Sequence, residues 1–119
     1  MKILFLDDNE ERIVTARSRF AGHELMIART AMEAISIFAS ATEWDLVMLD
    51  HDLGDSVYVN PRDENCGTFV VNHILREKPK IKRIIVHSWN APAARNMVRA
   101  LRAVNYLTWY EPFGIGRAL

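Results

Sequence analysis

The feature that most constrains the fold is an apolar stretch that runs directly into three ionisable residues. Residues 46–49 (LVML) are followed at once by Asp50, His51 and Asp52. A short apolar run of this kind is typical of a strand buried on both faces, as the strands of a parallel sheet are. Residues 3–6 and 84–86 repeat the pattern, and the polar residues that follow them are Asp7, Asp8, His87 and Ser88. Ligands of open α/β sheets bind at the carboxyl ends of the strands, so we expect one site there.

The rest of the chain alternates between strand and helix signals. We expect four helices, three of them capped by Asn9, Thr30 and Asn90, whose side chains can accept from free backbone N–H groups. Residues 53–66 read as a loop because glycine, proline, asparagine and aspartate are spread through them. The expected strands are residues 2–6, 23–28, 45–49, 81–86 and 105–110. Right-handed crossovers then predict a five-stranded parallel sheet with helices on both faces.

Composition and charge bound the class of protein. The 119 residues suffice for one domain, 1–119, and not for two. Lys plus Arg and Asp plus Glu both number 15, which argues against general nucleic-acid binding. The single cysteine, Cys66, cannot form an internal disulfide, so a reducing cytoplasmic location is expected. We expect no membrane association, because no apolar run approaches the roughly 20 residues of a span.

The order of these motifs resembles that of receiver domains, the phosphoacceptor modules of response regulators. The resemblance lies in the acidic pair Asp7–Asp8, in Asp50, in Ser88 and in the Pro-Phe of residues 112–113. It implies a flavodoxin-like three-layer fold with strand order 2-1-3-4-5. It also implies Mg²⁺ binding by the acidic pair, phosphorylation of Asp50, sensing of the phosphoryl group by Ser88, and a glycine, Gly67, that opens the third helix.

Four departures from that pattern point to a divergent branch. Glu111 stands where receivers have a lysine, and Asp50 is followed by His51 and Asp52. His87 precedes Ser88, with Asn90 two residues later, and the loop between Asp50 and Gly67 is longer than usual. These features are similar to those of the receiver branch proposed to process cyclic phosphates.

The clustered carboxylates predict a divalent metal site. Close carboxylates raise one another's pKa unless a cation intervenes, and oxygen ligands suit Mg²⁺ or Mn²⁺. We expect Asp7, Asp8, Asp50 and Asp52 to be the ligands, while inward-pointing histidines would widen the choice to Fe²⁺ or Zn²⁺.

The neighbouring residues are candidates for catalysis and for phosphate binding. Asp50, His51 and His87 are the catalytic candidates, since histidine transfers protons near neutral pH; the alternative is that each histidine only caps a strand end. The phosphate-binding candidates are Ser88, Asn90 and Arg62.

Glu111 weighs on the choice of function. Glu111 replaces an attraction to a phosphoryl group by a repulsion, and at about 4 Å and an effective dielectric near 20 each unit-charge pair is worth roughly 4 kcal/mol. A phosphoaspartate would then need a metal or an arginine such as Arg62, unless Glu111 points to solvent. We therefore favour an enzyme or binder of a phosphate ester, including a cyclic phosphate on a small molecule or a nucleotide end. The alternatives are a signalling receiver phosphorylated on Asp50 and a degenerate receiver that only binds proteins.

Two further features suggest protein contacts. Arg95, Arg99 and Arg102 form a stripe on the fourth helix, which is either a solvated face or a docking surface for an acidic protein partner. Residues 112–119 are too short and too rich in glycine and proline for the fifth helix of receivers. The bare sheet face predicts a homodimer that uses Phe113, Ile115 and Leu119, unless the tail folds back over its own sheet.

Overall fold

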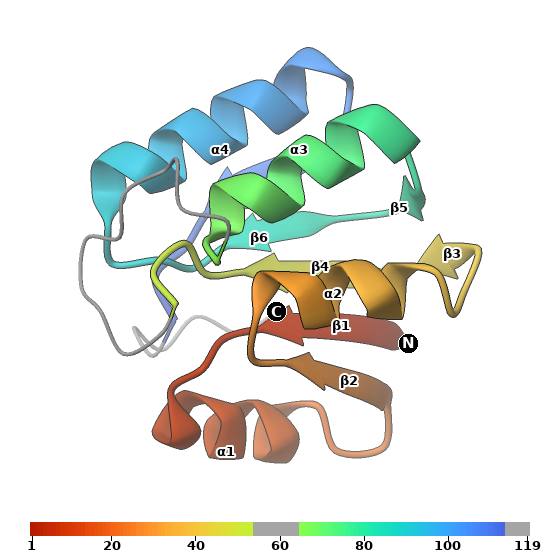
Figure 1. Cartoon of the computed structure of the whole chain (residues 1–119). Helices are drawn as coiled ribbons and strands as arrows, with labels where there is room; N and C mark the ends of the chain where they lie inside the picture. The colour runs from red at the N-terminus through yellow and green to blue at the C-terminus, as the bar shows by residue number, and fades with distance from the viewer. Residues whose placement is uncertain (54–64, 114–119) are drawn as a thin grey trace.

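The structure is a computed structural model of the chain that describes residues 1–53 and 65–113. Its larger sheet contains β1 (Lys2–Leu6), β2 (Glu24–Ala28), β4 (Leu46–Leu49), β6 (Ile84–Val86) and β7 (Thr108–Tyr110). Its helices are α1 (Glu10–Arg19), α2 (Ala31–Phe38), α3 (Gly67–Glu77) and α4 (Ala91–Ala103). Two short strands, β3 (Glu43–Trp44) and β5 (Lys80–Ile81), complete the elements (Figure 1).

The sheet has the expected parallel topology. Its strand order is β2-β1-β4-β6-β7, which is order 2-1-3-4-5 for the five main strands. All four pairings are parallel, and Leu6, Leu49 and Val86 lie level with one another across β1, β4 and β6. All four residues of β4 are buried, as the apolar run predicted. The flavodoxin-like receiver fold expected from the sequence is confirmed.

The small parallel sheet formed by β3 and β5 was not expected. We predicted continuous strands over 45–49 and 81–86; β4 fills the first range from Leu46 onward, whereas the second range is interrupted between β5 and β6. Asp45 lies between β3 and β4, and its side chain accepts from the backbone N–H of Lys2 at 2.7 Å. The two-stranded sheet lies at the edge opposite the carboxyl ends of the main strands (Figure 1).

The helices form layers on the two faces of the sheet (Figure 1). On one face, α2, α3 and α4 pack on the larger core cluster, which includes Val47, Leu49, Val70, Ile74 and Leu101. On the other face, α1 packs through Ile13 and Ala16 on a smaller cluster. Phe113 is 5% exposed and belongs to this second cluster, with its ring 5.2 Å from that of Phe5. Phe113 is thus buried in its own chain, while Ile115 and Leu119 lie outside the described residues and the dimer stays a prediction.

The helix starts follow the predicted caps. The side chains of Asn9, Thr30 and Asn90 accept from backbone N–H groups in the first turns of α1, α2 and α4. The start of α3 has no side-chain cap and lies hard against the end of β4. A Cβ atom at Gly67 would lie 2.3 Å from the carbonyl oxygen of Asp50, so only glycine fits without displacement of the backbone.

Two other expectations concern the loop and membranes. Most of the predicted loop, residues 54–64, lies outside the described residues; at its ends Asp52 and Cys66 form an isolated antiparallel bridge. Among the helices of the described ranges, none is long and apolar enough to cross a membrane.

Candidate metal and phosphate site

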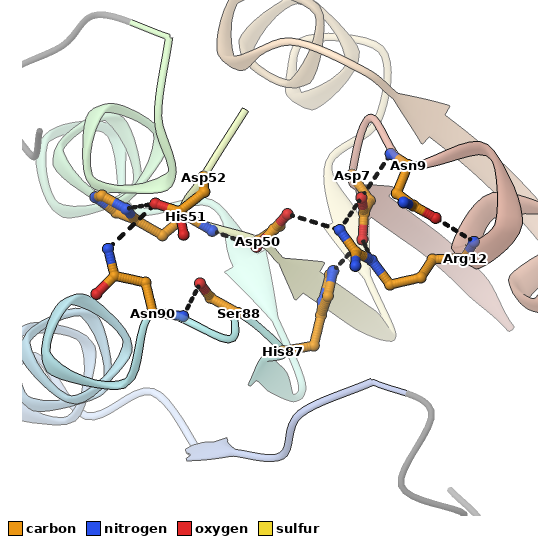
Figure 2. A network of polar contacts seen from close by, with 9 residues as sticks. All are labelled: Asp7, Asn9, Arg12, Asp50, His51, Asp52, His87, Ser88 and Asn90. Carbon is orange, nitrogen blue, oxygen red and sulfur yellow. Dashed lines mark hydrogen bonds and ion pairs between the residues drawn. The ribbon is translucent and has the colours of Figure 1, made fainter. Parts of the chain in front are cut away.

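The polar residues that follow β1, β4 and β6 lie together at one edge of the sheet (Figure 2). Backbone bonds hold them there, because each polar residue continues the ladder by one step. The N–H of Asp50 donates to the carbonyl of Leu6 at 3.1 Å, and the N–H of His87 donates to that of Leu49 at 2.9 Å. Asp7, Asp50 and His87 are 0%, 4% and 1% exposed. The predicted convergence of the three strand ends is therefore present in the fold.

Asp7, Asp50, His87 and Arg12 form an inner cluster at the middle of this edge. Arg12 donates to Asp7 twice, from Nε to Oδ2 at 2.6 Å and from Nη2 to Oδ1 at 3.0 Å. Its Nη2 is also 3.5 Å from Oδ2 of Asp50, and Nε2 of His87 is 3.0 Å from Oδ2 of Asp7. Ligand atoms of Asp7, Asp50 and His87 lie within 4.8 Å of one another. One cation can therefore be held by two carboxylates and an imidazole.

The ring of His87 is oriented by aromatic neighbours. It stacks on Phe5 with ring centroids 4.9 Å apart and an interplanar angle of 2°, and its centroid is 5.7 Å from that of Phe113. Within residues 1–53 and 65–113, its buried Nδ1 has no hydrogen-bond partner. Since apolar rings fix the imidazole plane, Nε2 remains directed at Asp7.

The pKa values of the two buried carboxyl groups are shifted in opposite directions. Burial raises the pKa of Asp50 to about 6, and the charge of Asp7 acts in the same direction. Burial also opposes ionisation of Asp7, but the hydrogen bonds from His87 and Arg12 outweigh it and lower the pKa of Asp7 to about 2. Two carboxyl groups with separated pKa values are typical of functional sites.

A second polar cluster adjoins the first through the backbone of His51. The N–H of His51 donates to Oδ1 of Asp50 at 2.9 Å, and its Nδ1 lies 2.9 Å from Oδ1 of Asp52. The side-chain amide of Asn90 donates to that same oxygen at 3.1 Å, and the backbone N–H of Asn90 donates to Oγ of Ser88 at 3.0 Å. These bonds tie the end of β4 to the start of α4, beside the inner cluster (Figure 2).

Cys66 lies against His51 at the start of α3, and both side chains are fully buried. Burial lowers the pKa of the His51 imidazole, but interactions with Cys66 and Asp52 outweigh it and raise that pKa overall. Burial likewise raises the pKa of the Cys66 thiol, whereas His51 and the backbone amides of Phe69 and Thr68 lower it overall. Nδ1 of His51 thus pairs with Asp52, whereas its buried Nε2 has no hydrogen-bond partner among the described residues.

Of the other predicted residues, those that the structure describes are not members of the three-residue donor group. Asp8 is half-buried, and neither Asp8 nor Asp52 belongs to the three-residue donor group found in the described part of the chain. Arg62 lies outside the described residues. Glu111 is half-buried, and its backbone N–H donates to the carbonyl of Val86. The donors that converge are therefore two carboxylates and one imidazole, where we expected four carboxylates.

Sequence reasoning missed Arg12, although the sequence carries a signal for it. Arg12 lies in the first turn of α1, where the helix dipole disfavours a cation. A cation in that position implies a nearby anion, and the anion is Asp7, two residues before the helix cap. The carboxylate pair raises the pKa of the Arg12 guanidinium despite its partial burial.

The donor set of the inner cluster fits a divalent ion. Carboxylate oxygens alone favour Mg²⁺, whereas the addition of an imidazole nitrogen favours Mn²⁺, Fe²⁺ or Zn²⁺. An acidic cluster of the kind through which receiver domains bind Mg²⁺ is present in the described residues, and His87 extends it.

The arginine stripe lies on a separate surface. Arg95, Arg99 and Arg102 line a groove of about 510 Å³ between α4 and β7, together with Val98, Trp109 and Tyr110. The Nε of Arg102 donates to the backbone carbonyl of Thr108 at 2.7 Å. Whether a partner uses this groove stays open to test.

Comparisons with known proteins agree with the fold and with the motifs. A solved structure of the signal receiver domain of a modulated diguanylate cyclase from Desulfovibrio desulfuricans G20 is similar, with a TM-score of 0.61 and 14% sequence identity. The match covers 97% of this chain and 82% of that one, and at this identity it shows the fold alone. No curated protein matches the chain. Residues 2–103 match the family described as Cyclic-phosphate processing Receiver domain. The chain therefore belongs to the cyclic-phosphate processing receiver domains.

Proposed function

We propose that this domain uses a divalent metal ion to bind a phosphate ester and to open it where the phosphate is cyclic. The observation that carries the proposal is the inner cluster, in which Asp7, Asp50 and His87 bring their ligand atoms within 4.8 Å of one another. The family description supports the same substrate class.

Separate groups of residues would hold the metal ion, bind the phosphate and neutralise its charge. Asp7, Asp50 and His87 would hold Mg²⁺ or Mn²⁺, which would polarise the phosphate. At the start of α4, the hydroxyl of Ser88 would contact the phosphate oxygens beside the positive end of the helix dipole. Arg12 supplies a fixed positive charge at the same edge. These groups would neutralise charge that develops on the phosphate.

We assign proton transfer to His51, because His87 would be a ligand of the metal ion. Asp52 holds the His51 ring through Nδ1, which is the arrangement that orients a catalytic imidazole. Ring opening of a cyclic phosphate breaks one P–O bond and forms another to water, and a proton passes from the water to the leaving oxygen. The His51 side chain is fully buried, so this role requires that water or the ester reach the ring.

Glu111 weighs against a plain phosphorelay role. Glu111 stands where receivers have a lysine, so a phosphoryl group on Asp50 would lack the support of that lysine. Arg12 offsets this loss in part, since its Nη2 lies 3.5 Å from Asp50. A receiver phosphorylated on Asp50 is therefore the second candidate, and Arg12 is the observation in its favour.

Two assays separate these candidates. Hydrolysis of 2′,3′-cyclic nucleotides is measured with Mn²⁺ for the wild type, Asp50→Asn and the exposed-site control Glu11→Gln. The proposal expects turnover that Asp50→Asn abolishes and Glu11→Gln retains. In parallel, acetyl phosphate and a beryllofluoride mimic are offered to the wild type. Stable modification of Asp50 without any cyclic-phosphate turnover would overturn the enzymatic proposal and favour the signalling receiver.

A further inference from the structure

We infer that Arg12 is a tethered counter-cation that competes with the divalent ion for Asp7 and that, once displaced, becomes a phosphate-binding group. This inference rests on the proposed function, since it concerns the regulation of the same site. It assigns a role to the residue that the sequence motifs left unexplained.

The competition follows from shared oxygen atoms. Arg12 engages both oxygens of Asp7 in a bidentate pair, and Oδ2 is also the atom that faces His87. A metal ion held by Asp7, Asp50 and His87 needs one of those same oxygens. The guanidinium would also stand within a few ångströms of the ion, and like charges repel strongly in a buried setting. The two cations therefore cannot occupy the Asp7 carboxylate in the same way at once.

The Arg12 side chain can leave Asp7 because it lies at the solvent side of the buried carboxylate. The Arg12 side chain is 27% exposed, whereas that of Asp7 is fully buried, so the guanidinium lies on the solvent side of the carboxylate. Among the described residues, Arg12 is the one lysine or arginine that pairs with Asp7 or Asp50. A guanidinium binds a phosphate through the same fork that it uses for a carboxylate. When the metal takes Asp7, Arg12 is the side chain placed to receive the phosphate.

This exchange makes metal and phosphate help each other to bind. Each ligand favours the state in which Arg12 has left Asp7, and such coupling is reciprocal. Inorganic phosphate should therefore tighten Mn²⁺ binding by the wild type. Arg12→Gln should bind Mn²⁺ more tightly in the absence of phosphate, on the order of tenfold, and should lose the phosphate effect.

The test is a Mn²⁺ titration, read from the resonance signal of free Mn²⁺, with and without inorganic phosphate. The proteins are the wild type, Arg12→Gln, Arg12→Gln/Asp50→Asn and Arg17→Gln; the last removes the same charge from an exposed position of α1. We expect tighter binding in Arg12→Gln, loss of that gain in the double variant and no change in Arg17→Gln. Mn²⁺ should also raise the melting temperature of Arg12→Gln by more than that of the wild type. A cooperative melting transition of this variant shows that it is folded.

Each contrary outcome has a definite meaning. Equal or weaker Mn²⁺ binding by a folded Arg12→Gln, beside clear binding by the wild type, overturns the role of Arg12 and leaves the metal site standing. If inorganic phosphate still tightens Mn²⁺ binding by Arg12→Gln, Arg12 is not the phosphate-binding group, and the metal site still stands. Absence of Mn²⁺ binding in both proteins overturns this inference and the proposed metal site together.

Discussion

Neutralising Asp50 should stabilise the metal-free protein at neutral pH. Burial raises the folded-state pKa of Asp50 to about 6, well above the ordinary value of an aspartate, so the folded protein disfavours the ionised carboxylate. A group of this kind stabilises the fold below its unfolded pKa, and that contribution is lost as pH rises through the folded pKa. The difference of about two pKa units corresponds to roughly 3 kcal/mol above pH 6. Asp50→Asn avoids this loss, although it gives up the charge attraction to Arg12, so we expect a net gain of about 1–3 kcal/mol.

Urea unfolding in the presence of a chelator measures this effect. The wild type, Asp50→Asn and the exposed-site control Glu11→Gln are compared at pH 4 and pH 7.5. Asp50→Asn should unfold at a higher urea concentration than the wild type at pH 7.5, and at almost the same urea concentration as the wild type at pH 4. Added Mn²⁺ should reverse the order, because the ion stabilises only a protein that keeps the carboxylate. A stability difference that is the same at both pH values would refute the reasoning, since it would show that burial of the charge is not the cause.

The remaining predictions concern the helix start, the metal and the assembly. Gly67→Ala should lower the free energy of unfolding by about 1–3 kcal/mol, because the added Cβ atom would meet the backbone of Asp50. Asn72→Ala, at an exposed position of α3, is the control, and equal stability of the two variants would contradict the packing argument. His87→Asn should remove any preference for Mn²⁺ over Mg²⁺ in calorimetric titrations, since the imidazole nitrogen is the donor that distinguishes the ions; an unchanged preference would exclude His87 as a ligand. We expect two chains to pair across the sheet face beside α1, so light scattering at micromolar concentration should give twice the monomer mass of 13.7 kDa. A monomer mass would contradict the predicted dimer.

Much of the fold and part of the site followed from local sequence patterns. The apolar run of residues 46–49 identified a strand buried on both faces, and Asn9, Thr30 and Asn90 marked helix starts because their side chains replace missing backbone acceptors. Strand ends that carry acids and histidines predicted where the site lies, since parallel strands deliver their carboxyl ends to one edge. The separate pairing of β3 with β5 was not predicted, because it depends on the register between two segments that lie far apart in the chain.

Patterns along the chain were enough to predict the topology, the edge of the sheet that carries the site and the kinds of side chain found there. Which of those side chains meet depends on how the elements pack in three dimensions. That packing groups Asp7 and Asp50 with His87, leaves Asp8 and Asp52 outside that group, and places Arg12 across the two buried carboxylates. The physical reason is that sequence pattern sets the direction in which a strand or helix presents its residues, whereas distances between side chains depend on register and on how α1 packs against the sheet. The same packing decides that one buried aspartate ionises readily and the other does not.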